Sequence, residues 1–179
     1  MLVDAFEKLQ EKHPFVELEM HSSLMKEDYM ATEIYQPLDG ERTIKKIKDN
    51  PAISNFNSFD IPRERILKEV YPRADMFIFP SLQEGTPYVI QEAMSYGLPI
   101  VSTNCSSAIP EFVEDEKNGL LIDVQNDMRE KIIHNQDQAG KRVISKEFHE
   151  YLTNQIFEKI SMIIEDSRLK RSMRINNLN

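Results

Sequence analysis

Two glutamates, Glu84 and Glu92, lie eight positions apart and flank a segment that begins with Gly85. A carboxylate accepts two hydrogen bonds and therefore suits a pair of sugar hydroxyls. A glycine lets a ligand approach the backbone closely, and free N–H groups at the start of a helix bind phosphate. Together these groups suit a phosphate between two sugars, the chemistry of a nucleotide-sugar. The plainer alternative stays open at this point, with Glu84 as a loop surface residue and Glu92 as a helix surface residue.

A strand, a helix and a second strand must position this loop. Met76–Phe79 and Ile100–Ser102 are apolar runs that indicate parallel strands covered on both faces. Between them we expect a loop at Pro80–Gly85 and a helix at Thr86–Tyr96. The residues that mark the helix ends are Thr86 as N-cap, Pro87 as the first helical residue and Gly97 as a left-handed cap.

The rest of the chain also alternates between helical and extended patterns. Helices are expected at 2–12, before Asn50, at 62–71 and 109–113, and from Asp127 with a break near Gly140; strands are expected at Val16–Met20, 53–56 and Leu120–Ile122. An apolar stripe runs through Ile144, Phe148, Leu152, Ile156, Ile160 and Ile164. The basic run from Arg168 to Arg174 is interpreted as a solvated helix tail. This alternation predicts an α/β doubly wound fold with a mainly parallel sheet, in which ligands bind at the carboxyl ends of the strands.

Composition narrows the class of protein. The chain has 179 residues, 40% of them hydrophobic and 29% charged, which is an ordinary globular balance for a single domain. A net charge of −8 repels phosphate backbones, so nucleic acid is not an expected partner. No apolar run approaches the roughly 18 residues that span a bilayer, and the charged N-terminus has no signal-peptide core. We expect a soluble, cytoplasmic protein.

Other chemistry-bearing residues have plainer explanations. The four histidines, His13, His21, His134 and His149, and the single cysteine share no ligand spacing, so no metal site is expected. His21 follows a strand and either faces a ligand or has a structural role. Cys105 has no visible base beside it and is interpreted as a buried or loop thiol. Phe56 and Phe59 either stack on a nucleobase or pack in the core, and core packing is favoured.

Several motifs in register resemble the C-terminal, nucleotide-sugar-binding domain of family-4 glycosyltransferases, which have the two-domain GT-B fold with Rossmann-like halves. The resemblance covers residues 74–121. Its motifs are Ala74-Asp75, Pro80-Ser81, Glu84-Gly85, Glu92-Ala93-Met94, Gly97-Leu98-Pro99-Ile100-Val101, Pro110-Glu111 and Asn118-Gly119-Leu120-Leu121. Helix 2–12, the strand near Val16 and residues 63–71 resemble the family more loosely. Residues 123–150 do not follow it and are interpreted as an insertion.

The resemblance implies a role for each site residue. Glu84 would be the catalytic-site carboxylate that contacts the hydroxyls of the donor sugar, and Glu92 would hold the ribose of the nucleotide. The backbone amides of Gly85, Thr86, Tyr88 and Val89 would meet the diphosphate and the sugar. The family retains anomeric configuration and uses no bound metal or cofactor, and this chain has no Asp-x-Asp motif. A UDP, GDP or ADP sugar would be the donor, and a glycan or lipid-linked molecule the acceptor.

The chain also departs from the family pattern. Compared with the family, we expect residues 1–179 to lack the first strand, the Arg–Lys loop that meets the diphosphate and the N-terminal acceptor-binding domain. We therefore expect residues 1–179 to be one C-terminal domain without its first strand. Such a chain would bind a nucleotide weakly and would not transfer sugar by itself. The rival hypothesis is a non-catalytic α/β interaction module or a degenerate relic, which would bind no nucleotide.

Overall fold

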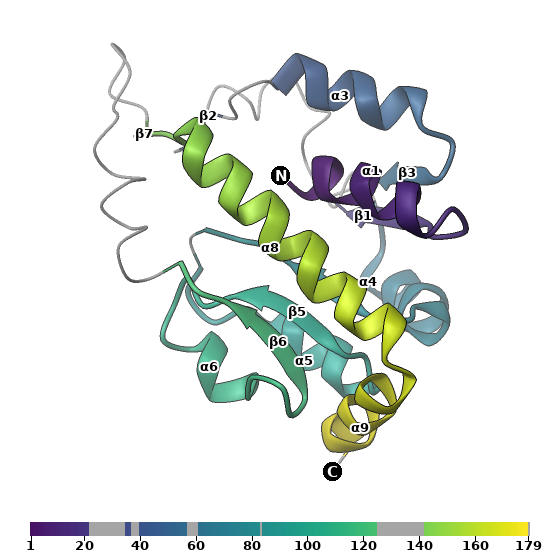
Figure 1. Cartoon of the computed structure of the whole chain (residues 1–179). Helices are drawn as coiled ribbons and strands as arrows, with labels where there is room; N and C mark the ends of the chain where they lie inside the picture. Colours follow the sequence, from purple (N-terminus) through teal and green to yellow (C-terminus); the bar gives the residue numbers. More distant parts are fainter. Residues whose placement is uncertain (22–34, 37–39, 57–60, 83, 125–141, 179) are drawn as a thin grey trace. The chain divides into compact units, whose positions relative to one another are not determined.

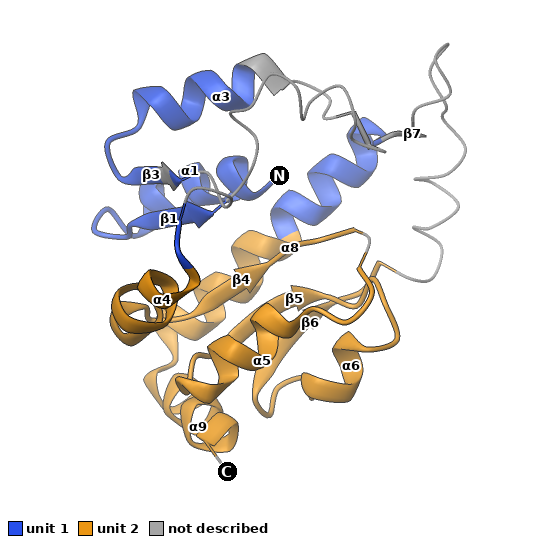
Figure 2. Cartoon of the chain, turned by 180° about the vertical axis from the view of Figure 1, so that it is seen from behind, with its two compact units in different colours: residues 1–62, 127–154 blue, residues 63–126, 155–179 orange. Residues whose placement is uncertain are grey.

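The chain divides into two compact units. The structure is a computed structural model that describes residues 1–21, 35–36, 40–56, 61–82, 84–124 and 142–178. Unit 1 comprises residues 1–62 and 127–154, and unit 2 comprises residues 63–126 and 155–179 (Figures 1 and 2). Every strand pair in the described residues is parallel. The predicted α/β class is therefore confirmed.

Unit 1 packs two helices against short parallel strands. Its elements are α1 (Leu2–Lys12), α3 (Gly40–Asp49), the pair β1 (Leu18–His21) and β3 (Ile53–Phe56), and the pair β2 (Tyr35–Gln36) and β7 (Arg142–Val143). Helix 2–12 and strand 53–56 are confirmed, and the strand predicted from Val16 begins at Leu18. The core is formed by Val3, Phe6, Leu18, Met20, Ile47 and Ile53.

Unit 2 is built on a three-stranded parallel sheet. β5 (Ile100–Thr103) is the central strand, between β4 (Phe77–Phe79) and β6 (Gly119–Ile122). All residues of β5 are buried, whereas those of β4 are half-buried. This difference fits a central strand beside an edge strand. The strands predicted near Met76, Ile100 and Leu120 are thus confirmed.

Two helices connect the strands of this sheet. α5 (Tyr88–Ser95) joins β4 to β5, and the short α6 (Ile109–Phe112) joins β5 to β6 (Figure 2). The core between α5 and the sheet includes Ile90, Ala93, Ile100, Ile109 and Val113. The chain enters β4 through α4 (Arg63–Arg65), a π-helical segment at Ile66–Val70 and a 3-10 turn at Tyr71–Arg73. The helix predicted at 62–71 is thus present but irregular.

The start of α5 differs from the prediction. Thr86 is not the N-cap: the helix begins at Tyr88, Pro87 is its N-cap, and no side chain of the described residues caps it. Pro87 has a φ of −79° and a ψ of 88°, which is not helical, and the N–H of Tyr88 donates to the carbonyl of Thr86 at 3.0 Å, so a tight γ-turn at Pro87 precedes the helix. The other end matches the prediction, because Gly97 has a φ of +69° and its N–H donates to the Met94 carbonyl at 2.7 Å.

The C-terminal part is two helices rather than one. α8 (Lys146–Glu165) buries Phe148, Leu152, Ile156 and Ile160 as predicted, but Ile163 is the fully buried residue of its last turn, in place of Ile164. A strict four-residue spacing rotates by about 40° per step around a 3.6-residue helix, so the buried stripe must step back by one position. Residues of α8 up to Asn154 belong to unit 1 and those from Gln155 to unit 2.

The basic run is not a plain solvated tail. It forms a separate helix, α9 (Ser167–Leu178), because Asp166 Oδ1 accepts hydrogen bonds from the N–H groups of Arg168 at 2.9 Å and Leu169 at 3.0 Å. Met173 is fully buried. Asn177 Nδ2 donates to the carbonyl of Leu98 at 2.8 Å. α9 is therefore part of the packing of unit 2.

Two predictions lie largely outside the described residues. The proposed insertion at 123–150 includes residues 125–141, and the helix expected from Asp127 lies within that range. Phe59 and His134 are likewise outside the described residues. Among the helices that the structure describes, none combines the length and the apolarity needed to cross a lipid bilayer.

Candidate functional site

Glu84 lies in the loop between β4 and α5, at the carboxyl end of β4. Its side chain is exposed. Ser81 Oγ donates to Glu84 Oε1 at 2.8 Å. In open parallel sheets, ligands bind at the carboxyl edge of the strands. The structure thus places this carboxylate at the edge where such a ligand would lie.

Hydroxyl groups at the end of β5 fasten the backbone of this loop. The hydroxyl of Thr103, a residue with no exposed surface, donates to the carbonyl of Ser81. The hydroxyl of Ser106 donates to the carbonyl of Gly85 at 3.2 Å. The loop is therefore bonded at Ser81 to the last residue of β5 and at Gly85 to the segment that follows β5.

Gly85 is a glycine that the fold does not require. It does not have a left-handed backbone, and a Cβ added to it would meet no heavy atom within 4 Å. In contrast, a Cβ at Gly119 would lie 2.6 Å from the carbonyl oxygen of Ile100. The open space at Gly85 fits a position where a ligand approaches the backbone.

The first turn of α5 offers fewer free amides than the sequence suggests. The N–H of Tyr88 donates to the carbonyl of Thr86 at 3.0 Å and is already engaged. Pro87 has no N–H group. Within the described residues, the N–H groups of Gly85, Thr86 and Val89 have no acceptor. These three amides are therefore the ones available to an anion, while the exposed Tyr88 side chain adds only contact surface.

Glu92 is on α5 and is paired with Arg63, the first residue of α4. Arg63 Nε lies 2.8 Å and Arg63 Nη2 lies 2.5 Å from the same carboxylate oxygen, Oε1 of Glu92. The side chain of Glu92 is 19% exposed, whereas that of Arg63 is 73% exposed. The carboxylate is therefore sheltered, and the guanidinium that covers one of its oxygens extends into solvent.

Tyr71 contacts the first turn of α5. It is buried, and its hydroxyl lies 3.4 Å from the carbonyl oxygen of Val89. Burial, together with the negative charge of Glu92, raises the pKa of Tyr71 to about 12. The hydroxyl thus stays protonated and acts as a donor to the first turn of the helix.

Arg63 and Tyr71 are the site residues that sequence reasoning missed. Arg63 precedes its partner Glu92 by 29 positions, and Tyr71 precedes Val89 by 18. No local period relates residues that far apart. The available signal was the position of residues 63–71 directly before β4, which places their helix beside the strand that carries the loop.

The remaining candidates have structural explanations, although one of them, Cys105, lies beside Glu84. His21 Nε2 lies 2.9 Å from Glu19 Oε1, and its ring stacks on Phe56 with centroids 5.6 Å apart, so both residues have structural contacts within unit 1. Burial raises the pKa of the Cys105 thiol, which keeps it protonated and unsuited to nucleophilic attack. In the part of the chain that the structure describes, no three His, Cys, Asp or Glu side chains are grouped as a metal site requires.

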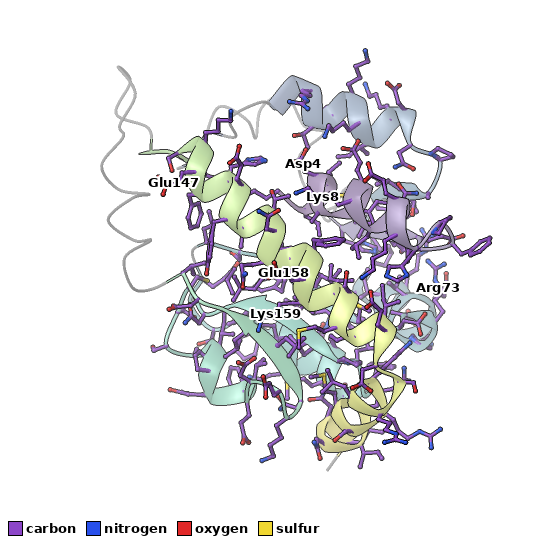
Figure 3. All side chains as sticks on the ribbon, viewed as in Figure 1. Asp4, Lys8, Arg73, Glu147, Glu158 and Lys159 are labelled. Atoms are coloured by element: carbon purple, nitrogen blue, oxygen red, sulfur yellow. The ribbon has the colours of Figure 1, made fainter. Side chains whose placement is uncertain are left out.

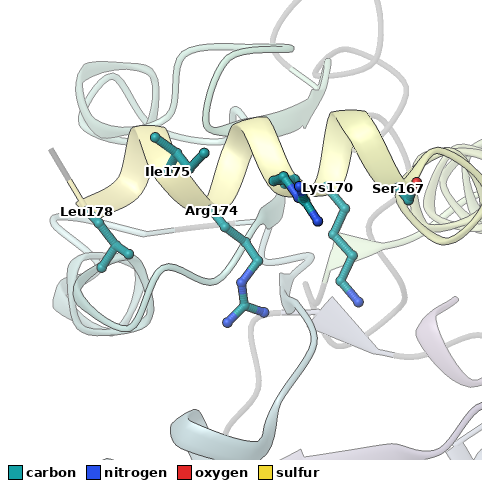
Figure 4. Close-up of a pocket in the computed structure, with 6 residues that line it drawn as sticks. Ser167, Lys170, Arg174, Ile175 and Leu178 are labelled. Carbon is teal, nitrogen blue, oxygen red and sulfur yellow. The ribbon is translucent and has the colours of Figure 1, made fainter.

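A hollow on the surface of α9 is chemically unlike the loop site. It has a volume of about 440 Å³ (Figure 4). Cations and apolar side chains form it, and it offers no carboxylate for sugar hydroxyls. Its lining residues are Ser167, Lys170, Arg171, Arg174, Ile175 and Leu178. The carboxylates, amides and hydroxyls described above therefore remain the candidate site.

Comparison with known families identifies the class of protein that carries this site. Residues 1–136 match the family described as glycosyl transferases group 1. The match includes the β4–α5 loop, Glu84, Glu92 and the strands that position them. The chain belongs to this family.

Sequence relatives cover only part of the chain. An uncharacterized glycosyltransferase of Haemophilus influenzae is 36% identical over 92 residues, which are 51% of this chain and 26% of that protein. The putative colanic acid biosynthesis glycosyltransferase WcaL of Escherichia coli is 42% identical over 69 residues, which are 35% of this chain and 16% of that protein. The alignments thus span about a quarter or less of these relatives.

Solved structures share the fold over nearly the whole chain. The pneumococcal O-GlcNAc transferase GtfA, in complex with UDP and GlcNAc, gives a TM-score of 0.67 at 19% identity and covers 99% of this chain and 28% of that one. The C-terminal domain of a glycosyl transferase group 1 family protein, LpcC, of Francisella tularensis gives 0.64 at 18% identity and covers 98% of this chain and 73% of that one. These likenesses establish a GT-B, Rossmann-like fold.

Proposed function

We propose that the β4–α5 loop of unit 2 is the donor site of a retaining family-4 glycosyltransferase, which takes a sugar from a nucleoside diphosphate. The observation that carries this proposal is an exposed carboxylate beside amides that have no acceptor in the described residues, at the carboxyl end of β4, with a second carboxylate on the helix that follows. Glu84 is exposed in the loop, Glu92 is sheltered on the helix, and Gly85 is open to close approach. Each group matches one part of a nucleotide-sugar.

In this proposal the two carboxylates have different partners. Glu84 accepts hydrogen bonds from the hydroxyls of the donor sugar, where its exposure lets the ligand reach it. Glu92 accepts the hydroxyls of the ribose. The amides of Gly85, Thr86 and Val89 donate to the diphosphate and stabilise the negative charge that grows on it as the sugar leaves. The side chains of Tyr88 and Val89 cover the ligand from the helix.

The comparisons support the donor and acceptor classes. One structure with this fold was solved with UDP and GlcNAc, and one sequence relative bears the name of a colanic acid biosynthesis enzyme. We infer a UDP, GDP or ADP sugar as the donor and a glycan or lipid-linked acceptor. The likeness to a separate C-terminal domain supports the same position for this chain in a larger enzyme.

Transfer requires an acceptor held against the donor, and such positioning supplies roughly 7–11 kcal/mol of the barrier. In this proposal a second domain holds the acceptor, so this chain by itself binds the donor without transferring the sugar. The diphosphate is met by N–H groups rather than by a metal ion, so binding in EDTA should equal binding in Mg²⁺.

A calorimetric titration with UDP, GDP and ADP tests nucleotide binding. We expect weak binding of one of them by the wild type and loss of most of that affinity in Glu92→Ala. Glu69→Ala is the matched control, because this exposed glutamate of unit 2 pairs with Arg65 rather than with a ligand. Binding of none of the three nucleotides would favour the rival function, a non-catalytic interaction module.

A second titration tests the role of Glu84. Glu84→Gln should weaken the nucleotide-sugar by about tenfold, as expected for hydrogen bonds to a charged group, and should leave the nucleoside diphosphate unchanged. Glu111→Gln, an exposed glutamate of α6, is the control. Equal weakening of both ligands would contradict a contact with the sugar.

A further inference from the structure

In the ion pair between Arg63 and Glu92, both contacts of the arginine are made to one of the two carboxylate oxygens. Both contacting nitrogens of Arg63 approach Oε1, at 2.8 Å and 2.5 Å. A carboxylate oxygen has about two lone-pair positions, so these two N–H groups fill the capacity of Oε1. Within the described residues Oε2 of Glu92 accepts no hydrogen bond. One oxygen of the carboxylate is thus occupied and the other is open.

Stability of the fold does not account for this pair. The side chain of Arg63 is 73% exposed, and ion pairs with an exposed partner contribute about 0–1 kcal/mol. The apolar core of unit 2 is formed by other residues of α5 and the sheet. Arg63 lies in the same helical segment as Tyr71, whose hydroxyl faces the carbonyl of Val89. Two residues of that segment therefore contact α5.

A sugar hydroxyl would not displace Arg63 from Oε1. Both groups would make charge-assisted hydrogen bonds to the carboxylate, but the guanidinium adds an attraction between opposite charges that a neutral hydroxyl lacks. A neutral ribose would therefore leave the arginine in place and bind Oε2, which has room for two hydroxyl donors. The arginine would fix the rotation of the carboxylate while the ligand binds.

We propose that Arg63 is a positioning residue for nucleotide recognition: it holds Oε1 of Glu92 and presents Oε2 to the two hydroxyls of the ribose. This inference rests on the proposed function, in which Glu92 is the ribose-binding group. Arg63 acts through Glu92 and not through the phosphates, because its charge is already paired. Arg63 reaches Oε1 through two nitrogens of one planar guanidinium, whereas lysine has a single nitrogen and cannot make this convergent pair of contacts.

The test compares a ribonucleotide with its 2′-deoxy form, using whichever of UDP, GDP or ADP binds the wild-type chain. The wild type should lose about tenfold in affinity when the 2′-hydroxyl is removed, because a hydrogen bond to a charged acceptor is lost. Arg63→Ala should bind the ribonucleotide about tenfold more weakly and discriminate between the two ligands by less than about twofold. Arg63→Lys should change in the same direction.

Arg65→Ala is the matched control, because Arg65 is on the same short helix but pairs with Glu69 at 3.3 Å. It should retain the full discrimination. Thermal unfolding should be the same for Arg63→Ala and wild type, which shows that any change in affinity is local. The measurement is repeated at high salt, because a contact with phosphate would be screened whereas the ribose discrimination would not.

Three results would overturn the inference. They differ in whether they also overturn the proposed function of the site. Full discrimination retained in Arg63→Ala, with discrimination lost in Glu92→Ala, removes the role of Arg63 and leaves the proposed function intact. If Arg63→Ala weakens the binding of the ribonucleotide and of its 2′-deoxy form equally, and the effect depends on salt, Arg63 contacts the phosphates and does not position Glu92. No binding of any of the three nucleotides by the wild type removes both the inference and the proposed function.

Discussion

The hydroxyl of Thr103 at the end of β5 donates to the backbone carbonyl of Ser81, 22 residues earlier in the loop after β4. Thr103 has no exposed surface, so the accepting carbonyl has a partner that water does not replace. This contact fixes the start of the loop that carries Glu84. The candidate site is thus held by the neighbouring strand as well as by its own helix.

Thr103→Val should destabilise the chain by about 1–3 kcal/mol, because the shape of the side chain is nearly kept while a partly buried carbonyl loses its donor. The free energy of unfolding in urea measures this. Ser107→Ala, which changes an exposed hydroxyl in the same region, is the control and should alter stability by less than about 0.5 kcal/mol. A Thr103→Val variant as stable as that control would show that the contact does not fasten the loop.

Gly85→Ala should leave the fold intact and weaken the ligand. The added Cβ meets nothing within 4 Å in the described structure and the backbone is not left-handed, so thermal unfolding should be unchanged or slightly later. Affinity for the nucleotide-sugar should fall by about tenfold, since a methyl group would occupy the path of the ligand to the backbone. Unchanged affinity of Gly85→Ala, measured by calorimetry, would contradict a close approach of the ligand to the backbone at Gly85.

Gly119→Ala, in contrast to Gly85→Ala, should destabilise the fold. The added Cβ would lie 2.6 Å from the Ile100 carbonyl oxygen and 2.7 Å from Val113 Cγ1, so the strand β6 or its neighbours must move. We expect a loss of about 1–3 kcal/mol in the free energy of unfolding. Gly85→Ala is the matched control with the same change in composition. Equal stability of the two variants would contradict the close packing at β6.

The sequence is sufficient to predict β1, β3, β4, β5, β6 and most helices because their signals are local, whereas the two-residue strands β2 and β7 were not predicted. Apolar runs locate β4, β5 and β6, and Gly97 marks the end of α5 by its left-handed backbone. Glu84 and Glu92 could be singled out for the same reason, since both lie in one continuous motif. The helix start at Thr86 could not be predicted in this way, because Thr followed by Pro suits an N-cap and a first helical residue equally well, and only the structure shows the γ-turn at Pro87.

The contacts that complete the site could not be predicted because they join distant parts of the chain. Arg63 reaches Glu92 across 29 positions, and the hydroxyl of Thr103 reaches back to the loop. Neither pair follows from helical or strand periodicity. The burial of Ile163 rather than Ile164 in α8 also depends on tertiary packing, which decides which face of the helix is covered.

Acid sensitivity should arise at Asp4 of α1 in unit 1 (Figure 3). Burial alone would raise the pKa of Asp4, but hydrogen bonds from Lys46 and the Met1 amino group outweigh it and hold the pKa well below the usual range. Lys46 Nζ lies 2.6 Å from Asp4 Oδ1. A lowered folded-state pKa stabilises the fold above about pH 4 and less as the pH falls below it. Asp4→Asn should therefore lose about 1–2 kcal/mol at pH 7 and show a flatter decline in acid.

The second acid-sensitive group in unit 1 is His149, whose Nε2 lies 3.0 Å from Asp4 Oδ2. Burial lowers its pKa, so its contribution is complete above about pH 6.5 and declines as the pH falls through the lowered value. Urea unfolding from pH 8 to pH 3 should thus show two declines in the wild type. Glu11→Gln, on an exposed position of α1, is the control for Asp4→Asn. An identical acid limb in Asp4→Asn and this control would contradict the assignment.

The most direct test of the donor site is a map of where a nucleotide-sugar contacts the chain. A ¹⁵N NMR titration of the whole chain with UDP-, GDP- and ADP-sugars reports each backbone amide separately. We expect one of these ligands to shift the amide signals of Gly85, Thr86 and Val89 together, and Glu92→Ala to abolish the shifts. Shifts confined to α9 or to unit 1, or no shifts with any of the three ligands, would contradict this expectation.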